Sequence, residues 1–202
     1  MYRLMFSGGV LIKIATIANA ICFFGLGLDK NSFSHPLVPV TIVLWSFNFL
    51  VSTSYYIGKH LLYSSPHFTL NNSITQRAAH DLLECAIVQI PSLKKEWHIV
   101  DKCIKNAIGY KITNGRIPYM RSRTIPVAFV FMEDKSSVFV TNEYRHLSIE
   151  DKALVMIHEC AHIGLNAVDH AYRWQPEFHK LTGKQHYENA DSFMDAVLYH
   201  CT

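Results

Sequence analysis

Charged side chains are distributed unevenly along this chain of 202 residues. The chain contains 19 lysines and arginines and 16 aspartates and glutamates, yet only five of them lie within residues 1–62. The density of charge is therefore roughly threefold higher after residue 62. We expect a hydrophobic, membrane-anchoring region over residues 1–62 and a separately folded domain over residues 63–202.

The overall composition supports this division and argues against one class of function. Hydrophobic residues make up 50% of the chain and charged residues 17%, which favours a membrane-embedded segment. The net charge is only +3 and the basic residues are scattered, so we expect no nucleic-acid partner. Five cysteines without a CxxC pair indicate neither a zinc ribbon nor a disulfide scaffold, and they favour a reducing compartment.

The strongest candidate for a membrane span is the apolar run over residues 37–58. It carries no charged side chain and ends near Tyr55 and Tyr56, at the position where a membrane interface favours aromatic residues. A run of this length crosses a hydrocarbon core of about 30 Å. The sequence therefore predicts a transmembrane helix here.

A second, weaker run lies over residues 8–28 and contains Lys13 near its amino end. The short polar segment between the two runs is typical of a helical hairpin, so we expect contact with membrane lipid through residues 8–58. The basic residues outside the hairpin, Arg3 and Lys59, favour a cytoplasmic location for both ends and for the domain that follows.

Two other interpretations of the first region stay open. The segment Ala18-Asn19-Ala20 has the small-x-small form that precedes the cleavage site of a signal peptide. Apolar length also does not distinguish a bilayer span from a helical hairpin buried in a soluble protein.

The second region has the pattern of an α+β domain. Apolar residues recur at helical spacing over residues 73–89 and 93–107. Valine and phenylalanine are concentrated in residues 126–133 and 137–141, which flank a polar turn, so we expect a β-hairpin. If residues 137–141 form the edge of the sheet, an extended peptide could bind there by strand addition.

The next predicted helix begins after Ser148, which is a favourable N-cap residue with Asp151 three positions later. This helix carries the HExxH pattern, formed by His158, Glu159 and His162. Histidines four residues apart lie one above the other on one face, so both can bind one zinc ion while the glutamate reaches a metal-bound water. The pattern therefore favours zinc-dependent hydrolysis over two solvated histidines without a metal. Cys160, between the ligands, is expected to be a packing residue.

A zinc site of this kind needs a third protein ligand. The metzincin extension of the motif requires a glycine and a histidine at the positions of Leu165 and Val168, so this subclass is excluded. A gluzincin takes a glutamate from a following helix, for which Glu188 is the candidate. Asp169 is the better-supported alternative, because Tyr172 follows it at a spacing of three residues.

At Asp169, Tyr172 and the segment Asn189-Ala190-Asp191, the sequence resembles the aspzincins, the deuterolysin and peptidyl-Lys metalloendopeptidase group. That family combines HExxH with a GTxDxxYG pattern and an Asn-Ala-Asp segment, and the resemblance extends over residues 73–197. It implies a zincin-like metallopeptidase domain. The roles that it implies are zinc ligation by His158, His162 and Asp169, general base catalysis by Glu159, and donation to the transition state by Tyr172.

This sequence departs from the family pattern at Asn166 and Ala167, which replace Gly-Thr, and at Arg173, which replaces glycine. Asn166 still permits a tight turn, because asparagine tolerates positive φ. Lysine-selective members use two acidic residues, of which the first corresponds to Asp191 and the second to Met194. Asp191 is therefore expected either to bind substrate or to support a zinc-bound histidine.

These observations together predict a membrane-located zinc metalloendopeptidase that acts on a protein or peptide, with a possible preference for lysine. Three alternatives stay open: a gluzincin-type protease that uses Glu188, a delivered toxin or effector protease, and a non-enzymatic membrane protein with a degenerate HExxH.

Overall fold

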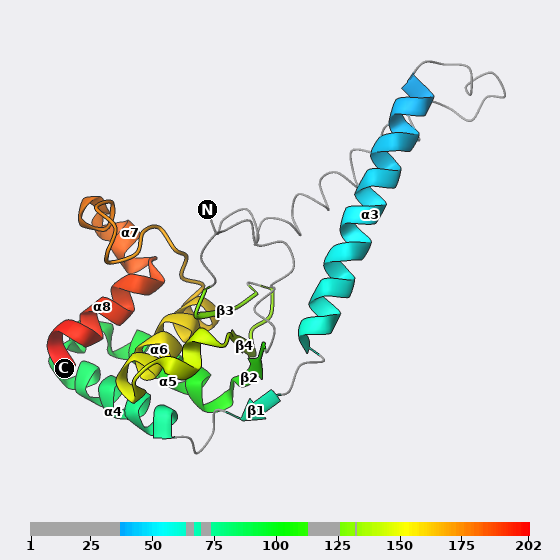
Figure 1. Ribbon diagram of the computed structural model, residues 1–202. Coiled ribbons are helices and arrows are strands. Elements are labelled where there is room, and N and C mark those ends of the chain that lie inside the picture. Colours follow the sequence, from blue (N-terminus) through cyan, green and yellow to red (C-terminus); the bar gives the residue numbers. More distant parts are fainter. Residues whose placement is uncertain (1–36, 64–66, 70–73, 113–125, 132) are drawn as a thin grey trace. The chain divides into compact units, whose positions relative to one another are not determined.

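A computed structural model describes residues 37–63, 67–69, 74–112, 126–131 and 133–202 of the chain (Figure 1). The chain divides into two compact units. Helix α3 belongs to the first unit, and the strands and helices that follow it along the chain belong to the second.

Helix α3 (Leu37–Tyr63) contains the whole uncharged run over residues 37–58. Among the residues that the structure describes, however, no helix has both the length and the apolar character that a membrane crossing requires. The structure thus gives no support to the transmembrane helix predicted over residues 37–58. The other predicted span, over residues 8–28, lies outside the described residues.

The second unit combines a small sheet with helices, which confirms the predicted α+β class. Its described strands are β1 (His67–Thr69), β2 (Ile108–Lys111), β3 (Ala128–Phe129) and β4 (Ser137–Val140), in the order β1-β2-β4-β3. Strands β2 and β4 are parallel, and the two outer pairs are antiparallel.

Strands β3 and β4 form the predicted hairpin, with Phe129 opposite Phe139. The expectation that residues 137–141 form the sheet edge is wrong, because β4 lies between β2 and β3 and all four of its residues are buried. The rings of Phe129, Phe139 and Tyr110 form a continuous stack at centroid distances of 5.1 and 5.2 Å. Aromatic packing of this kind requires neighbouring strands on both sides of β4.

The longer helices of this unit are α4 (Ile74–Gln89), α5 (Lys94–Asn106), α6 (Ile149–Leu165) and α8 (Ala190–Cys201). Helices α4 and α6 each pack against the other three. Trp97 of α5 is fully buried and meets Phe193 of α8 edge to face at 5.4 Å. Short helical segments over Pro91–Leu93, Glu143–His146, Phe178–Lys180 and Gly183–Tyr187 complete the connections.

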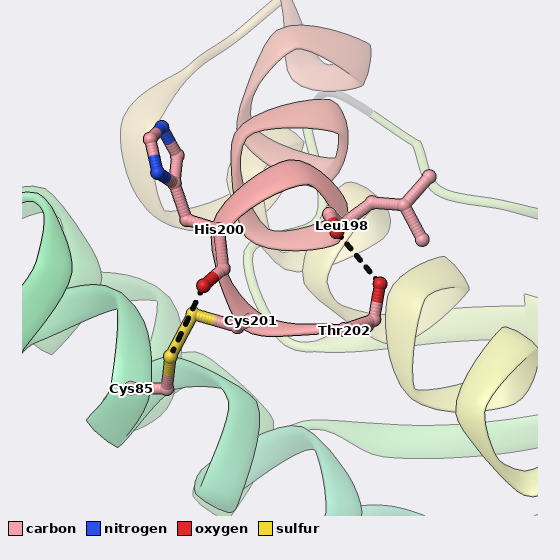
Figure 2. Close-up of a disulfide and its surroundings, with 5 residues drawn as sticks. All are labelled: Cys85, Leu198, His200, Cys201 and Thr202. Carbon is pink, nitrogen blue, oxygen red and sulfur yellow. Dashed lines mark hydrogen bonds between the residues drawn. A yellow bond between two sulfur atoms is a disulfide. The ribbon is translucent and has the colours of Figure 1, made fainter.

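A disulfide bond joins Cys85 of α4 to Cys201 at the end of α8 (Figure 2). The two residues are 116 positions apart in the sequence, so the bond closes a long loop of the chain. The odd number of cysteines did not predict this pairing. A cross-link over a loop of this length removes much conformational freedom from the unfolded chain and thereby stabilises the folded one.

Breaking this bond is expected to destabilise the second unit. The variant Cys201→Ser should lower the free energy of unfolding by about 3 kcal/mol, because the unfolded chain regains the entropy of the open loop. Urea denaturation of the full chain measures the change. The variant Tyr199→Ala is the control, since this neighbouring side chain is largely exposed. Equal unfolding midpoints for Cys201→Ser and the unmodified chain would contradict a stabilising role for the bond.

Candidate metal centre

Helix α6 begins and ends with two local features that the sequence predicts. The side chain of Ser148 accepts a hydrogen bond from the amide of Asp151 at 3.0 Å and so caps the first turn. Asn166 follows the last turn of α6 and has a left-handed backbone conformation, with φ of 56°. Among the described residues other than glycine, it is the one with a positive φ. The chain can reverse there because asparagine tolerates this conformation.

The chain that returns from Asn166 runs beside the start of α8 and is fixed by one buried side chain, Asn189. The carboxamide oxygen of Asn189 accepts hydrogen bonds from the amides of His170 and Ala171, at 2.8 and 3.3 Å. Its nitrogen donates to the carbonyl of Ala171 at 3.0 Å and to the hydroxyl of Ser192 at 3.1 Å. Asn189 therefore sets the path of the segment that carries Asp169 and Tyr172.

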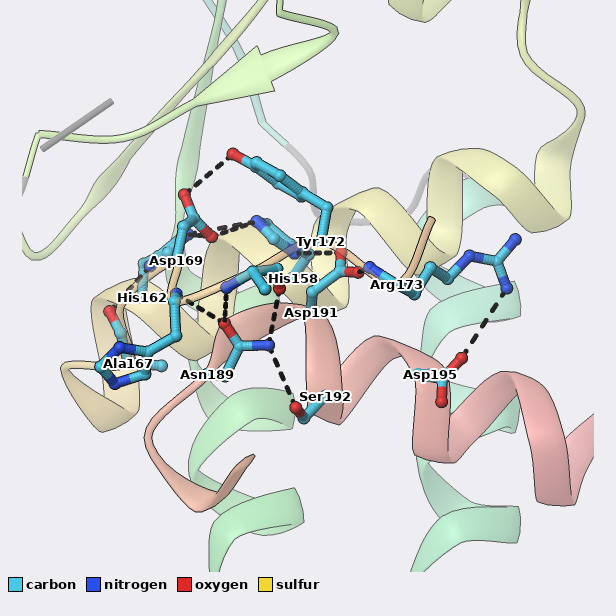
Figure 3. Close-up of polar contacts among 12 residues, drawn as sticks. His158, His162, Ala167, Asp169, Tyr172, Arg173, Asn189, Asp191, Ser192 and Asp195 are labelled. Carbon is cyan, nitrogen blue, oxygen red and sulfur yellow. Dashed lines mark hydrogen bonds and ion pairs between the residues drawn. The ribbon is translucent and has the colours of Figure 1, made fainter. Parts of the chain in front are cut away.

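Three side chains converge where this segment meets the middle of α6 (Figure 3). The Nε2 atoms of His158 and His162 are 3.1 Å apart, and Asp169 Oδ1 lies 3.3 and 3.2 Å from them. Within the described part of the chain, this is the one group of three acidic, histidine or cysteine residues whose ligand atoms lie close enough to share a metal ion. The predicted ligands His158, His162 and Asp169 are thus brought together.

The carboxylate of Asp169 provides a test of whether this group fits a metal. Its Oδ1 atom is buried and forms no hydrogen bond, although it points toward two imidazole nitrogens. A buried acceptor without a hydrogen-bond partner is costly, and such an atom needs an explanation in a folded protein. A cation bound among one carboxylate oxygen and two imidazole nitrogens would satisfy it, so the donor set fits a metal ion.

Electrostatic interactions among these residues are strong because the site is buried. Burial alone would lower the pKa of His158, but the carboxylates of Asp169 and Asp191 outweigh it and raise that pKa to about 10. Burial likewise opposes ionisation of Asp169, yet its contacts with His158 and His162 hold the pKa of that carboxyl far below its usual range. The site therefore favours the ionised carboxylate of Asp169 next to a positively charged group.

Glu159 lies on the same helix between the two histidines and is also buried. Burial raises the pKa of its carboxyl, and the neighbouring His158 and His162 oppose that increase. Glu159 is not part of the group that can share a metal ion. Its position beside the two histidines is that expected of a residue that exchanges protons at such a site.

The second ring nitrogen of each histidine, Nδ1, also has a partner. His162 Nδ1 donates to the carbonyl of Ala167 at 2.8 Å, which leaves Nε2 with the lone pair that a metal needs. His158 Nδ1 lies 3.3 Å from Asp191 Oδ1. Asp191 is only 1% exposed, and its other oxygen accepts a hydrogen bond from the amide of Arg173. Contacts of this kind orient metal-binding histidines.

The geometry therefore favours one of the two roles expected for Asp191. Its carboxylate is engaged on both oxygens inside the protein, so a substrate lysine would find no exposed acid at this position. Asp195 is exposed and pairs with Arg173 at 3.9 Å (Figure 3). Lysine binding at Asp191 receives no support from this arrangement.

Tyr172 lies against the same group through its hydroxyl and its ring. The hydroxyl donates to Asp169 Oδ2 at 3.0 Å, and the ring stacks on His158 at a centroid distance of 6.1 Å. The ring of Trp174 stacks almost parallel on the ring of Tyr172 at a centroid distance of 4.6 Å, while Trp174 remains 69% exposed. Sequence reasoning missed Trp174, because a tryptophan in a turn has no spacing signal of its own. It named Asn189 within the Asn-Ala-Asp segment but assigned no role to its side chain.

Glu188, the alternative ligand, does not join the group. Its carboxylate lies 3.8 Å from His170 Nε2 and 3.7 Å from Lys184 Nζ, on a side chain that is about half exposed. The main chain of Glu188 instead accepts a hydrogen bond from Val168 at 2.7 Å and so helps to hold the returning segment. Comparison of the chain with family models, curated proteins and solved structures finds no match.

The two candidate third ligands predict opposite metal-binding results. Asp169→Ala should weaken zinc binding by several orders of magnitude, because it removes the only carboxylate of the described group. Glu188→Ala should leave the affinity within a few-fold of the unmodified chain. Competition with a chelator of known affinity measures both. A chain that keeps zinc without Asp169 and releases it without Glu188 would establish the gluzincin alternative.

Asp191→Asn separates the two roles considered for Asp191. If this carboxylate orients His158, the variant should bind zinc about 10 to 100-fold more weakly, as expected for a lost outer contact. Asp195→Asn, one helical turn further along α8, is the matched control and should bind zinc normally. Unchanged zinc affinity in Asp191→Asn would contradict the orienting role.

Proposed function

We propose that this chain is a zinc-dependent endopeptidase whose metal is held by His158, His162 and Asp169. The observation that carries the proposal is the convergence of these three side chains beside Glu159, a buried carboxyl that lies outside the group able to share a metal ion. Three protein ligands leave a fourth position for water or substrate, which is typical of catalytic rather than structural zinc sites.

The donor types support zinc as the metal. Two imidazole nitrogens and one carboxylate oxygen are common zinc ligands, and both histidines have the outer contacts that zinc sites use. Zinc bound there would act as a Lewis acid toward a peptide carbonyl and would lower the pKa of a water molecule toward about 7.

Glu159 is the proposed general base and then general acid. Its carboxylate would take a proton from the attacking water and deliver it to the amine that leaves when the peptide bond breaks. Burial raises the pKa of the Glu159 carboxyl, which helps this group to hold a proton before it delivers that proton to the leaving amine.

Tyr172 is proposed to donate a hydrogen bond to the oxygen that becomes negative during the reaction. A contact of this type is worth about 3 kcal/mol in comparable sites. Without substrate the hydroxyl donates to Asp169, so substrate binding would have to redirect it. The stack with Trp174 holds the ring in place and extends an exposed aromatic surface beside the site, where an apolar side chain of a protein or peptide substrate could rest.

The variant Glu159→Gln tests the proposal. It should keep zinc bound and reduce turnover of a peptide library by several orders of magnitude, because the amide cannot accept the proton. Glu188→Gln is the matched control and should retain both zinc and activity. Zinc analysis and cleavage assays on the full chain give the two readouts. Wild-type cleavage by Glu159→Gln would refute the mechanism, and zinc binding without any cleavage by the unmodified chain would refute the function.

A further inference from the structure

The cysteines of α5 and α6 that remain outside the disulfide lie against each other. Cys103 Sγ is 2.7 Å from Cys160 Sγ, and both residues are present as free cysteines. Cys160 is fully buried, whereas Cys103 is partly exposed. The mechanism proposed above uses neither thiol.

The close packing of α5 and α6 explains why the two sulfur atoms meet. A Cβ atom at Gly164 would lie 2.8 Å from the side chain of Ile99 and 3.5 Å from its carbonyl oxygen. A larger residue than glycine would therefore push the helices apart at this crossing. Helix α5 also buries Trp97, Val100 and Ile104. These side chains fix the rotation of α5 about its own axis.

We propose that Cys103 and Cys160 form a second, reversible disulfide that ties α5 to the helix carrying His158, Glu159 and His162. A disulfide requires a sulfur separation of about 2.05 Å, so the two atoms need to approach by less than one ångström. This inference is independent of the hydrolytic function, because it depends only on the packing of two helices.

The reaction needs an oxidant, for which a small disulfide such as oxidised glutathione suffices. The thiol of Cys103 is the more accessible one, so after losing its proton it attacks the glutathione disulfide and releases one glutathione thiol. The sulfur of Cys160 then loses its proton, attacks Cys103 Sγ and releases the second glutathione thiol. Two protein thiols and one glutathione disulfide thus give one protein disulfide and two glutathione thiols.

The bond would leave the metal ligands in place. Cys160 is two residues from each histidine, which places it on the opposite side of α6 from both, since each residue advances the helix by about 100°. Cys160 is also absent from the group that can share a metal ion. The disulfide would therefore act as a covalent link behind the metal site and would restrain α6 in oxidising conditions.

Peptide mapping of the full chain tests the inference. The folded protein is incubated with oxidised glutathione, its remaining thiols are alkylated, and it is digested without reductant. We expect a linked peptide that contains Cys103 and Cys160, its loss after treatment with dithiothreitol, and its absence from Cys103→Ser. The linked peptide containing Cys85 and Cys201 is the internal control in every sample.

A thermal readout accompanies the mapping. Oxidised glutathione should raise the Tm of the unmodified chain, because the new cross-link restrains the unfolded state. It should leave the Tm of Cys103→Ser unchanged. Recovery of Cys103 and Cys160 as alkylated thiols, or of Cys103 as a stable mixed disulfide with glutathione, would overturn the inference when the Cys85–Cys201 peptide is intact.

Discussion

Burial of the Asp169 carboxylate against two histidines is the interaction on which the second unit depends. Taking an ionised carboxylate out of water costs several kcal/mol unless charged partners and hydrogen bonds compensate. His158, His162 and Tyr172 supply these partners, and Asn189 holds the backbone that delivers Asp169 to them. A bound metal would complete the compensation at Oδ1, the atom without a hydrogen bond.

The two sides of α6 have different functions in this account. One side presents the histidines to the segment that returns from Asn166. The other packs against α5, where the contact between Gly164 and Ile99 brings the helices close together. The position of the ligands therefore depends on the packing behind them, and a cross-link between Cys103 and Cys160 would act on the site through the same helix.

The sequence predicted the parts of this arrangement that have a short-range pattern. Helices α4, α5 and α6, the β3–β4 hairpin, the Ser148 cap and the turn at Asn166 follow from periodicity and from local backbone preferences. Strands β1 and β2 were missed because they are short and acquire their partners from distant parts of the chain. The membrane prediction relied on length and lack of charge, and these two features do not distinguish a bilayer span from a helix in another environment. The burial of Asp191 depends on tertiary packing, which spacing alone does not contain.

Anomalous diffraction at the zinc absorption edge, from crystals of the full chain grown with zinc, tests the central claim most directly. We expect one strong peak at about 2.0 to 2.2 Å from Nε2 of His158, Nε2 of His162 and a carboxylate oxygen of Asp169. The absence of a peak among these atoms, or a peak held by Glu188 in place of Asp169, would contradict it.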